Sequence, residues 1–190
     1  MPGVYLAGPE VFLPDAVEIG RRKRELCAAY GFEGLYPLDN EIPTAAGERV
    51  DKLIYDANKA MMVRADLGIC NLTPFRGPGA DAGTVFELGL MVGLNKPVFA
   101  YTNDAADYAH RVGMFAPAAR ERLRDDHDLE VENFGNFDNL MLEWAVRESC
   151  GHPVVRHAAS AADRYRDLAG FEQCLRLAAA RFSSAMPQRR

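Results

Sequence analysis

The chain has 190 residues, of which 48% are hydrophobic and 26% are charged, and its formal net charge is −5. This length and composition allow one compact domain with a sizeable core. The only basic run is the short segment 21–24, and no apolar run approaches the ~18 residues that a membrane span needs, so neither nucleic-acid binding nor membrane insertion is expected.

Strands and helices alternate along the first half of the chain. The apolar pattern predicts strands at 4–7, 32–36, 67–72 and 97–101, separated by helices at 15–30, about 44–65 and 84–94. Such alternation predicts an α/β fold, with a doubly wound parallel sheet that carries helices on both faces.

The second half is less regular. The short stretch 129–131 is the candidate for a fifth strand, and a helix is expected at 136–149. An amphipathic helix rich in Ala and Arg should follow at about 158–182. No internal repeat or low-complexity linker interrupts the chain, so we expect a single domain with a core over about 1–150 and a C-terminal helical extension over about 151–190.

The segment 81–87 is the most informative for function. It places two carboxylates, Asp81 and Glu87, on a glycine-containing turn that opens into an apolar helix. The turn lies beyond the carboxyl end of a predicted strand, where open parallel sheets bind ligands, and two acids held close together indicate bond cleavage. The alternative is a capping box, in which Glu87 bonds the backbone N–H of Thr84.

Three other polar residues each allow a structural or a functional interpretation, and a fourth is expected to be structural. Asn58 falls on the apolar face of its helix, where a buried amide either binds a ligand or ties the helix to a neighbouring loop. Tyr5 on the first strand is a core residue or a donor to a carboxylate. Arg76 is a solvated loop residue or an anion contact, and Asp66 should be structural at a helix-to-strand junction.

Cysteine and histidine give no sign of a metal or a cofactor. The cysteines are scattered, without a Cys-x-x-Cys pair, and are expected to be reduced thiols: Cys27, Cys70, Cys150 and Cys174. The histidines show neither a Ser-His-Asp order nor a metal-ligand spacing: His110, His127, His152 and His157. No charged-then-apolar leader stands at the amino terminus, so a cytoplasmic protein is expected.

Several short motifs, taken together, resemble the nucleoside 2-deoxyribosyltransferase family. They occur in the family's order at residues 4–9, 37–40, 65–66, 71–77, 81–89, 96–97 and 139–141. Each motif alone would be weak evidence, but their joint occurrence favours the catalytic interpretation of Glu87 over the capping box.

The resemblance implies a flavodoxin-like sheet of five parallel strands and an enzyme that moves 2-deoxyribose between nucleobases. It makes Glu87 the nucleophile, Asp81 the residue that protonates the base, and Tyr5 the residue that positions the nucleophile. We expect Glu87 to be ionised, since the first turn of a helix stabilises negative charge, and Asp81 to hold a proton. The implied ligands are 2′-deoxyribonucleosides and free nucleobases, with no cofactor.

The resemblance also implies substrate contacts by Gly8, Phe12, Glu41, Asn58, Asn139 and Met141. Asn58 stands where some family members have an aspartate, so it can orient a base or a sugar hydroxyl but cannot donate a proton as an acid. Asn139, with Met141 beside it, would complete the site of a neighbouring subunit, which implies a homo-oligomer. An N-glycoside hydrolase acting on nucleosides or nucleoside 5′-monophosphates, and a non-catalytic nucleotide sensor, are the competing hypotheses.

Overall fold

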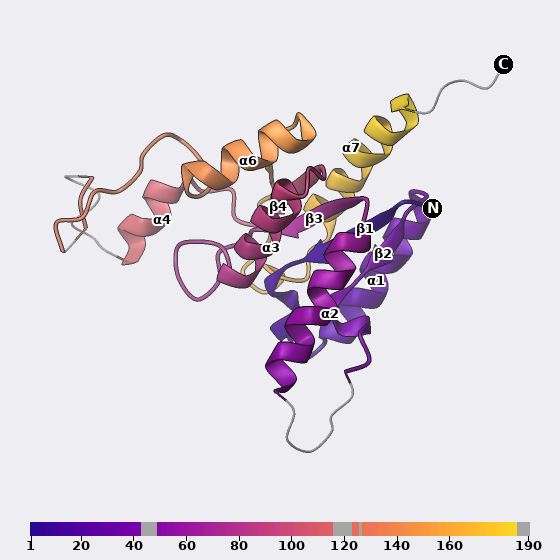
Figure 1. Ribbon diagram of the computed structural model, residues 1–190. Helices are drawn as coiled ribbons and strands as arrows, with labels where there is room; N and C mark the ends of the chain where they lie inside the picture. The colour runs from indigo at the N-terminus through magenta and orange to yellow at the C-terminus, as the bar shows by residue number, and fades with distance from the viewer. Residues whose placement is uncertain (43–48, 116–122, 126, 186–190) are drawn as a thin grey trace.

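The computed structural model describes residues 1–42, 49–115, 123–125 and 127–185. Its centre is a five-stranded sheet in the order β2-β1-β3-β4-β5, in which every pair of neighbouring strands is parallel (Figure 1). The strands are β1 (Gly3–Ala7), β2 (Glu33–Leu35), β3 (Leu67–Asn71), β4 (Val98–Thr102) and β5 (Val155–Arg156). The predicted α/β architecture is therefore confirmed.

Helices cover both faces of the sheet. The α-helices are α1 (Ala16–Ala29), α2 (Val50–Arg64), α3 (Ala82–Gly93), α4 (Tyr108–Phe115), α6 (Leu140–Cys150) and α7 (Ala169–Ala185). Two short 3-10 helices, η1 (Pro9–Phe12) and η2 (Pro37–Asp39), follow β1 and β2. Helices α1 and α7 pack on one face, whereas α2, α3 and α6 pack on the other (Figure 1).

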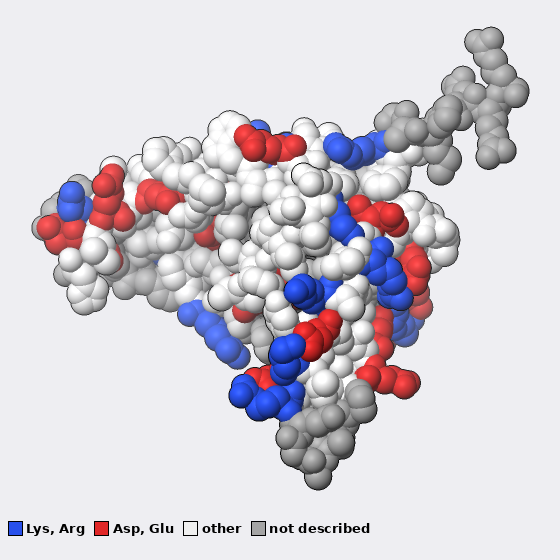
Figure 2. Space-filling view, viewed as in Figure 1, with Lys and Arg blue, Asp and Glu red and all other residues white. Residues whose placement is uncertain are grey.

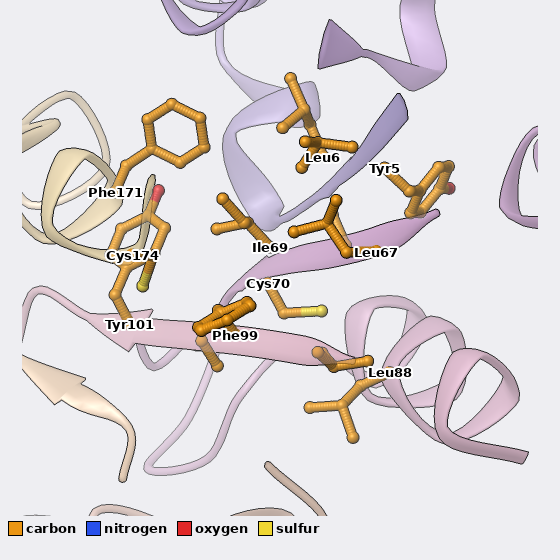
Figure 3. Close-up of a cluster of buried hydrophobic side chains, with 14 of the residues drawn as sticks. Tyr5, Leu6, Leu67, Ile69, Cys70, Leu88, Phe99, Tyr101, Phe171 and Cys174 are labelled. Carbon is orange, nitrogen blue, oxygen red and sulfur yellow. The ribbon is translucent and has the colours of Figure 1, made fainter. Parts of the chain in front are cut away.

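The core lies between these two layers of helices. Every residue of β1, β3 and β4 is buried, as expected for strands covered on both faces. Tyr5 and Gly68 stand side by side in the sheet beneath α3, and a Cβ atom on Gly68 would lie only 2.8 Å from the sulfur of Met91. On the opposite face, the rings of Tyr101 and Phe171 meet at 6.2 Å (Figure 3).

The fifth strand was predicted in the wrong place. Strand β5 pairs with β4 through Tyr101 and Val155, whereas the predicted stretch 129–131 lies on a loop with an isolated antiparallel bridge between Arg124 and Glu130. The side chain of Leu129 is 62% exposed. A strand of two residues leaves almost no periodicity in the sequence, so its position depends on pairing with β4.

The residues after 150 add β5 and a C-terminal helix that packs on the sheet. The predicted C-terminal helix is confirmed, but it begins at Ala169, because residues 161–166 form turns and 158–160 and 167–168 are irregular. Four residues on one side of α7 are fully buried against the sheet: Phe171, Cys174, Leu175 and Ala178. Helix α6 likewise begins later than predicted, at Leu140.

Two further predictions were that Asp66 is structural and that no segment spans a membrane. Asp66 is structural as expected, since its Oδ2 accepts the backbone N–H of Gly3 at 2.7 Å and ties β1 to the start of β3. Over the residues that the structure describes, no helix is both long and apolar enough to cross a bilayer.

Candidate active site

A cavity of about 420 Å³ lies beyond the carboxyl end of β1, where the chain connections diverge to β2 on one side and β3 on the other. Ligands of open α/β sheets bind at such a switch point. We call it the carboxylate cavity. Its lining residues come from η1, η2, α2 and α3 and the turns beside them: Gly8, Val11, Phe12, Pro37, Leu38, Asn40, Ile42, Ile54, Asn58, Asp81, Gly83, Thr84 and Glu87.

Tyr5 and Glu87 form a hydrogen-bonded pair at this cavity. The Tyr5 hydroxyl donates to Glu87 Oε1 at 2.5 Å, joining β1 to α3. Tyr5 is fully buried, and burial together with the negative charge of Glu87 raises the pKa of its phenol far above the ordinary range, so it remains a donor. The pair therefore fixes one oxygen of Glu87 and leaves Oε2 without a hydrogen-bond partner among the described residues.

Burial raises the pKa of Glu87 to about 7. The hydrogen bond from Tyr5 opposes this shift, and the nearby charge of Asp81 adds to it. The expectation that a helix terminus would keep Glu87 ionised is wrong. Helix α3 begins at Ala82, so Glu87 lies in the second turn, beyond the free N–H groups of the first.

Asp81 caps α3, which overturns the alternative interpretation of Glu87. Its Oδ2 accepts the backbone N–H of Thr84 at 2.9 Å and the Thr84 hydroxyl at 3.0 Å. Thr84 is thus inside the helix and is not the cap of a Thr84–Glu87 capping box. Asp81 Oδ1 has no hydrogen-bond partner among the described residues, so one carboxyl oxygen remains for a ligand.

Asn58 ties its helix to a neighbouring loop, which is one of the two roles that its position suggested, and it also borders the cavity. It lines the cavity, and its Oδ1 accepts a hydrogen bond from Asn40 Nδ2 at 3.1 Å, which ties α2 to the turn after η2. Asn40 also donates to the carbonyl of Pro37 at 3.1 Å. These bonds fix the side-chain oxygen of Asn58 and leave its NH₂ group as a donor for a ligand.

Gly8 and Phe12 form the wall on the η1 side. A Cβ atom on Gly8 would lie 2.2 Å from Glu10 Oε2, so only glycine fits between the cavity and the buried Glu10. The ring of Phe12 is 58% exposed and stacks on Phe75 with centroids 5.3 Å apart. An exposed ring at a cavity mouth is a suitable stacking surface for a planar base.

Three of the expected contacts lie outside the carboxylate cavity. Glu41 is exposed, although its neighbours Asn40 and Ile42 line the cavity. Asn139 caps α6, where its side-chain oxygen accepts the N–H of Met141 at 3.0 Å. The Met141 side chain is 68% exposed. The last two residues were expected to serve a neighbouring subunit, and within one chain they do not reach this site.

A buried polar cluster behind the cavity wall was not predicted from the sequence. Glu10 and Lys23 are almost completely buried and form an ion pair, and Asn71 Nδ2 donates to Glu10 Oε2 at 2.9 Å. Removing one partner of such a pair would leave an uncompensated buried charge. Among the described residues, no three side chains of the His, Cys, Asp or Glu type gather to hold a metal ion.

The sequence profile of the nucleoside 2-deoxyribosyltransferase family matches residues 4–141, which span the strands and helices that build this cavity. The chain belongs to this family. A solved structure named as a 2-desoxiribosyltransferase from Leishmania mexicana is 30% identical, with a TM-score of 0.61, and the match covers 91% of this chain and 98% of that one.

Two other proteins match over most of their length. An uncharacterized protein of Schizosaccharomyces pombe is 32% identical over 188 residues, covering 89% of each chain. A conserved protein of Enterococcus faecalis V583 shares the fold with a TM-score of 0.55 at 20% identity, covering 93% of this chain and 98% of that one.

Proposed function

We propose that this protein is a nucleoside 2-deoxyribosyltransferase that exchanges the base of 2′-deoxyribonucleosides through a covalent deoxyribosyl-Glu87 intermediate. The observation that carries the proposal is the Tyr5–Glu87 pair, whose 2.5 Å hydrogen bond presents a carboxylate to the cavity that Asp81 also lines. Membership of the family supports the same reaction.

In the first half-reaction, Glu87 Oε2 attacks C1′ of the deoxyribose as the bond from C1′ to the base nitrogen breaks. The electron pair of that bond leaves with the base, and the transition state resembles an oxocarbenium ion. A carboxylate below C1′ stabilises this cation and then forms the ester. A 2-deoxy sugar is expected because a 2-hydroxyl would withdraw electrons from the developing cation.

The departing base needs a proton, which we assign to Asp81. Its Oδ2 is held by Thr84, so a proton on Oδ1 leaves the helix cap in place. A second base then takes the vacated position, returns the proton to Asp81 and attacks C1′, which releases Glu87 with overall retention of configuration. Phe12 provides a stacking surface for each base, and the NH₂ group of Asn58 orients it.

A second subunit is part of the proposal. The described chain leaves apolar side chains exposed on α3 and α6, namely Phe86, Met141 and Trp144, at 52%, 68% and 57%. The area over these helices is largely uncharged on the face in view (Figure 2). Such a surface suits a homo-oligomer in which Asn139 of one chain approaches the cavity of another.

The test is to incubate the protein with deoxyinosine, with and without free adenine, and to follow products by chromatography. Deoxyadenosine that forms only with adenine supports base exchange. Release of hypoxanthine without exchange would instead indicate an N-glycoside hydrolase, and no reaction would favour a nucleotide sensor. Glu87→Gln is the matched control, because glutamine preserves the hydrogen bond from Tyr5 but is too weak a nucleophile to form the ester.

A further inference from the structure

A second cavity, of about 350 Å³, lies beyond the carboxyl ends of β3 and β4. It is formed by the loops that follow these strands, by α4 and by the segment before α7, and we call it the arginine cavity. Its lining residues are Pro74, Arg76, Gly77, Asp104, Arg111, Arg164 and Tyr165. Three arginines and one aspartate thus line this cavity.

Arg164 is only partly satisfied by its surroundings. Its Nη2 donates to Asp104 Oδ2 at 2.8 Å, but its Nε is buried and has no hydrogen-bond partner among the residues that the structure describes. A buried donor without a partner is unfavourable, and native proteins rarely leave one unless a ligand or water completes it. The Arg164 side chain as a whole is 35% exposed, and its Nη1 makes no hydrogen bond to the described residues, so Nη1 rather than the buried Nε is the donor available to a ligand in this cavity.

Arg76 is held over the mouth of the same cavity. Its backbone adopts a left-handed conformation with φ of 57°, which is uncommon for a residue with a side chain. The guanidinium carbon lies 4.6 Å from the ring centre of Phe75 and 5.4 Å from that of Phe12. No carboxylate pairs with Arg76 in the described part of the chain. Its charge is therefore positioned by aromatic contacts and not neutralised.

Arg111 contributes charge from behind the wall. It is 3% exposed, and its Nε and Nη1 donate to the carbonyls of Pro78 and Ala106 at 2.8 and 2.6 Å. The nearest carboxylate is Asp138, at 3.5 Å. Asp104, on the other wall of the cavity, also acts on the Arg111 charge, so Arg111 adds a positive charge that two carboxylates partly balance.

The walls of the arginine cavity are fixed before any ligand enters. The Tyr165 hydroxyl donates to the carbonyl of Pro74 at 2.6 Å, and Asn103 Nδ2 donates to the carbonyl of Arg164 at 2.9 Å. The backbone N–H of Asn103 also donates to the Thr73 hydroxyl at 2.9 Å. These bonds tie the loops after β3 and β4 to the segment before α7, so the guanidinium groups keep their places.

We propose that the arginine cavity binds a phosphate group through Arg164 and Arg76. Guanidinium donors suit the oxygens of a tetrahedral oxyanion, and the contacts come from Nη1 of Arg164 and from Arg76, neither of which bonds a carboxylate of the described residues. The site extends beyond the proposed base exchange, and it adjoins that site because Phe12 of the carboxylate cavity stacks on Phe75 beneath Arg76.

The experiment is a calorimetric titration with inorganic phosphate at constant ionic strength. Arg164→Gln and Arg76→Gln should each weaken binding by about tenfold or more, as expected for the loss of a charge-assisted hydrogen bond. Arg166→Gln is the matched control: it removes the same charge two residues away, from a residue that pairs with Asp15 outside the cavity. Asp104→Asn should tighten binding, because it removes the carboxylate that competes for Arg164.

The source of the phosphate is settled by repeating the titration with deoxyinosine present and with deoxyadenosine 5′-monophosphate as the ligand. If the phosphate is a separate ion, deoxyinosine leaves its binding unchanged. If it belongs to a nucleotide that fills both cavities, the nucleotide binds more tightly than phosphate and deoxyinosine displaces it. Either result supports the site when Arg164→Gln weakens it.

The proposal is overturned if neither probe binds saturably, or if Arg164→Gln and Arg76→Gln both bind like the wild type. These outcomes are independent of base exchange, since they are read as heat of binding and concern residues outside the carboxylate cavity.

Discussion

Replacing Tyr5 with phenylalanine should move the acidic limb of the pH–rate profile to higher pH. The Tyr5 hydroxyl lowers the pKa of Glu87, which burial has raised to about 7, and only the ionised carboxylate can attack C1′. A hydrogen bond to a charged group contributes about 1.5–3 kcal/mol, and one pKa unit corresponds to about 1.4 kcal/mol. The pKa that defines the acidic limb should therefore rise by about one to two units.

The assay is kcat/KM for base exchange between deoxyinosine and adenine, measured from acidic to alkaline pH. In the wild type, activity should fall as the pH drops through the Glu87 pKa of about 7, because the nucleophile becomes protonated. In Tyr5→Phe, the rate at neutral pH should fall by about tenfold or more, and part of it should return at alkaline pH.

Tyr36→Phe is the control for this substitution. Tyr36 is 1% exposed at the end of β2, and its hydroxyl has no hydrogen-bond partner among the described residues. It should leave the pH–rate profile unchanged. The reasoning is refuted if Tyr5→Phe lowers the rate equally at every pH, since Tyr5 would then serve only the packing of the core.

The remaining predictions concern the two carboxylates and the assembly. Glu87→Gln should become progressively more stable than the wild type as the pH rises from 4.5 to about 7, because over this range the unfolded wild type releases the Glu87 proton while the folded wild type still holds it, which lowers the stability of the wild type alone. The gain measured by chemical denaturation should approach, but not exceed, about 3 kcal/mol, and a pH-independent difference would contradict the buried, protonated Glu87. Asp81→Asn should keep the α3 cap, so its Tm should be near that of the wild type, while exchange falls far more for ordinary bases than for a nucleoside with an activated leaving group. Equal losses for both would mean that Asp81 positions the ligand without donating a proton. Mixing Glu87→Gln with Asn139→Ala subunits should restore activity above either parent, since some sites then contain both native residues; no gain after confirmed subunit exchange would place Asn139 outside the neighbour's site.

The sequence predicted those parts of the fold that are buried on both sides. Strands β1, β3 and β4 leave continuous apolar runs, and each was placed within about a residue of its observed bounds. The start of α3 was misplaced because Asp81 and Thr84 are both good cap residues, and the local sequence does not say which one caps. That small difference moved Glu87 from the first turn to the second and changed the cause that sets its pKa.

The candidate sites were predictable only where their residues are close together in the sequence. Asp81 and Glu87 are neighbours in one motif, and the resemblance to a family supplied Tyr5. By contrast, Arg76, Arg111 and Arg164 come from three distant segments, which meet only because β3 and β4 end side by side. The ion pair of Glu10 and Lys23 is equally hidden, because each residue alone is expected at the surface.

The single hydrogen bond on Glu87 also bears on turnover. Tyr5 donates to Oε1 and so stabilises the free carboxylate more than the neutral ester that forms on Oε2, because hydrogen bonds to charged acceptors are the stronger ones. Tyr5 therefore favours breakdown of the covalent intermediate, and the same hydrogen bond lowers the pKa of the Glu87 nucleophile. It follows that Tyr5→Phe, given deoxyinosine alone at alkaline pH, should accumulate more of the deoxyribosyl-enzyme than the wild type does. Intact-protein mass spectrometry after acid quenching measures this, and an equal or smaller ester fraction in Tyr5→Phe would show that Tyr5 does not discriminate between the carboxylate and its ester.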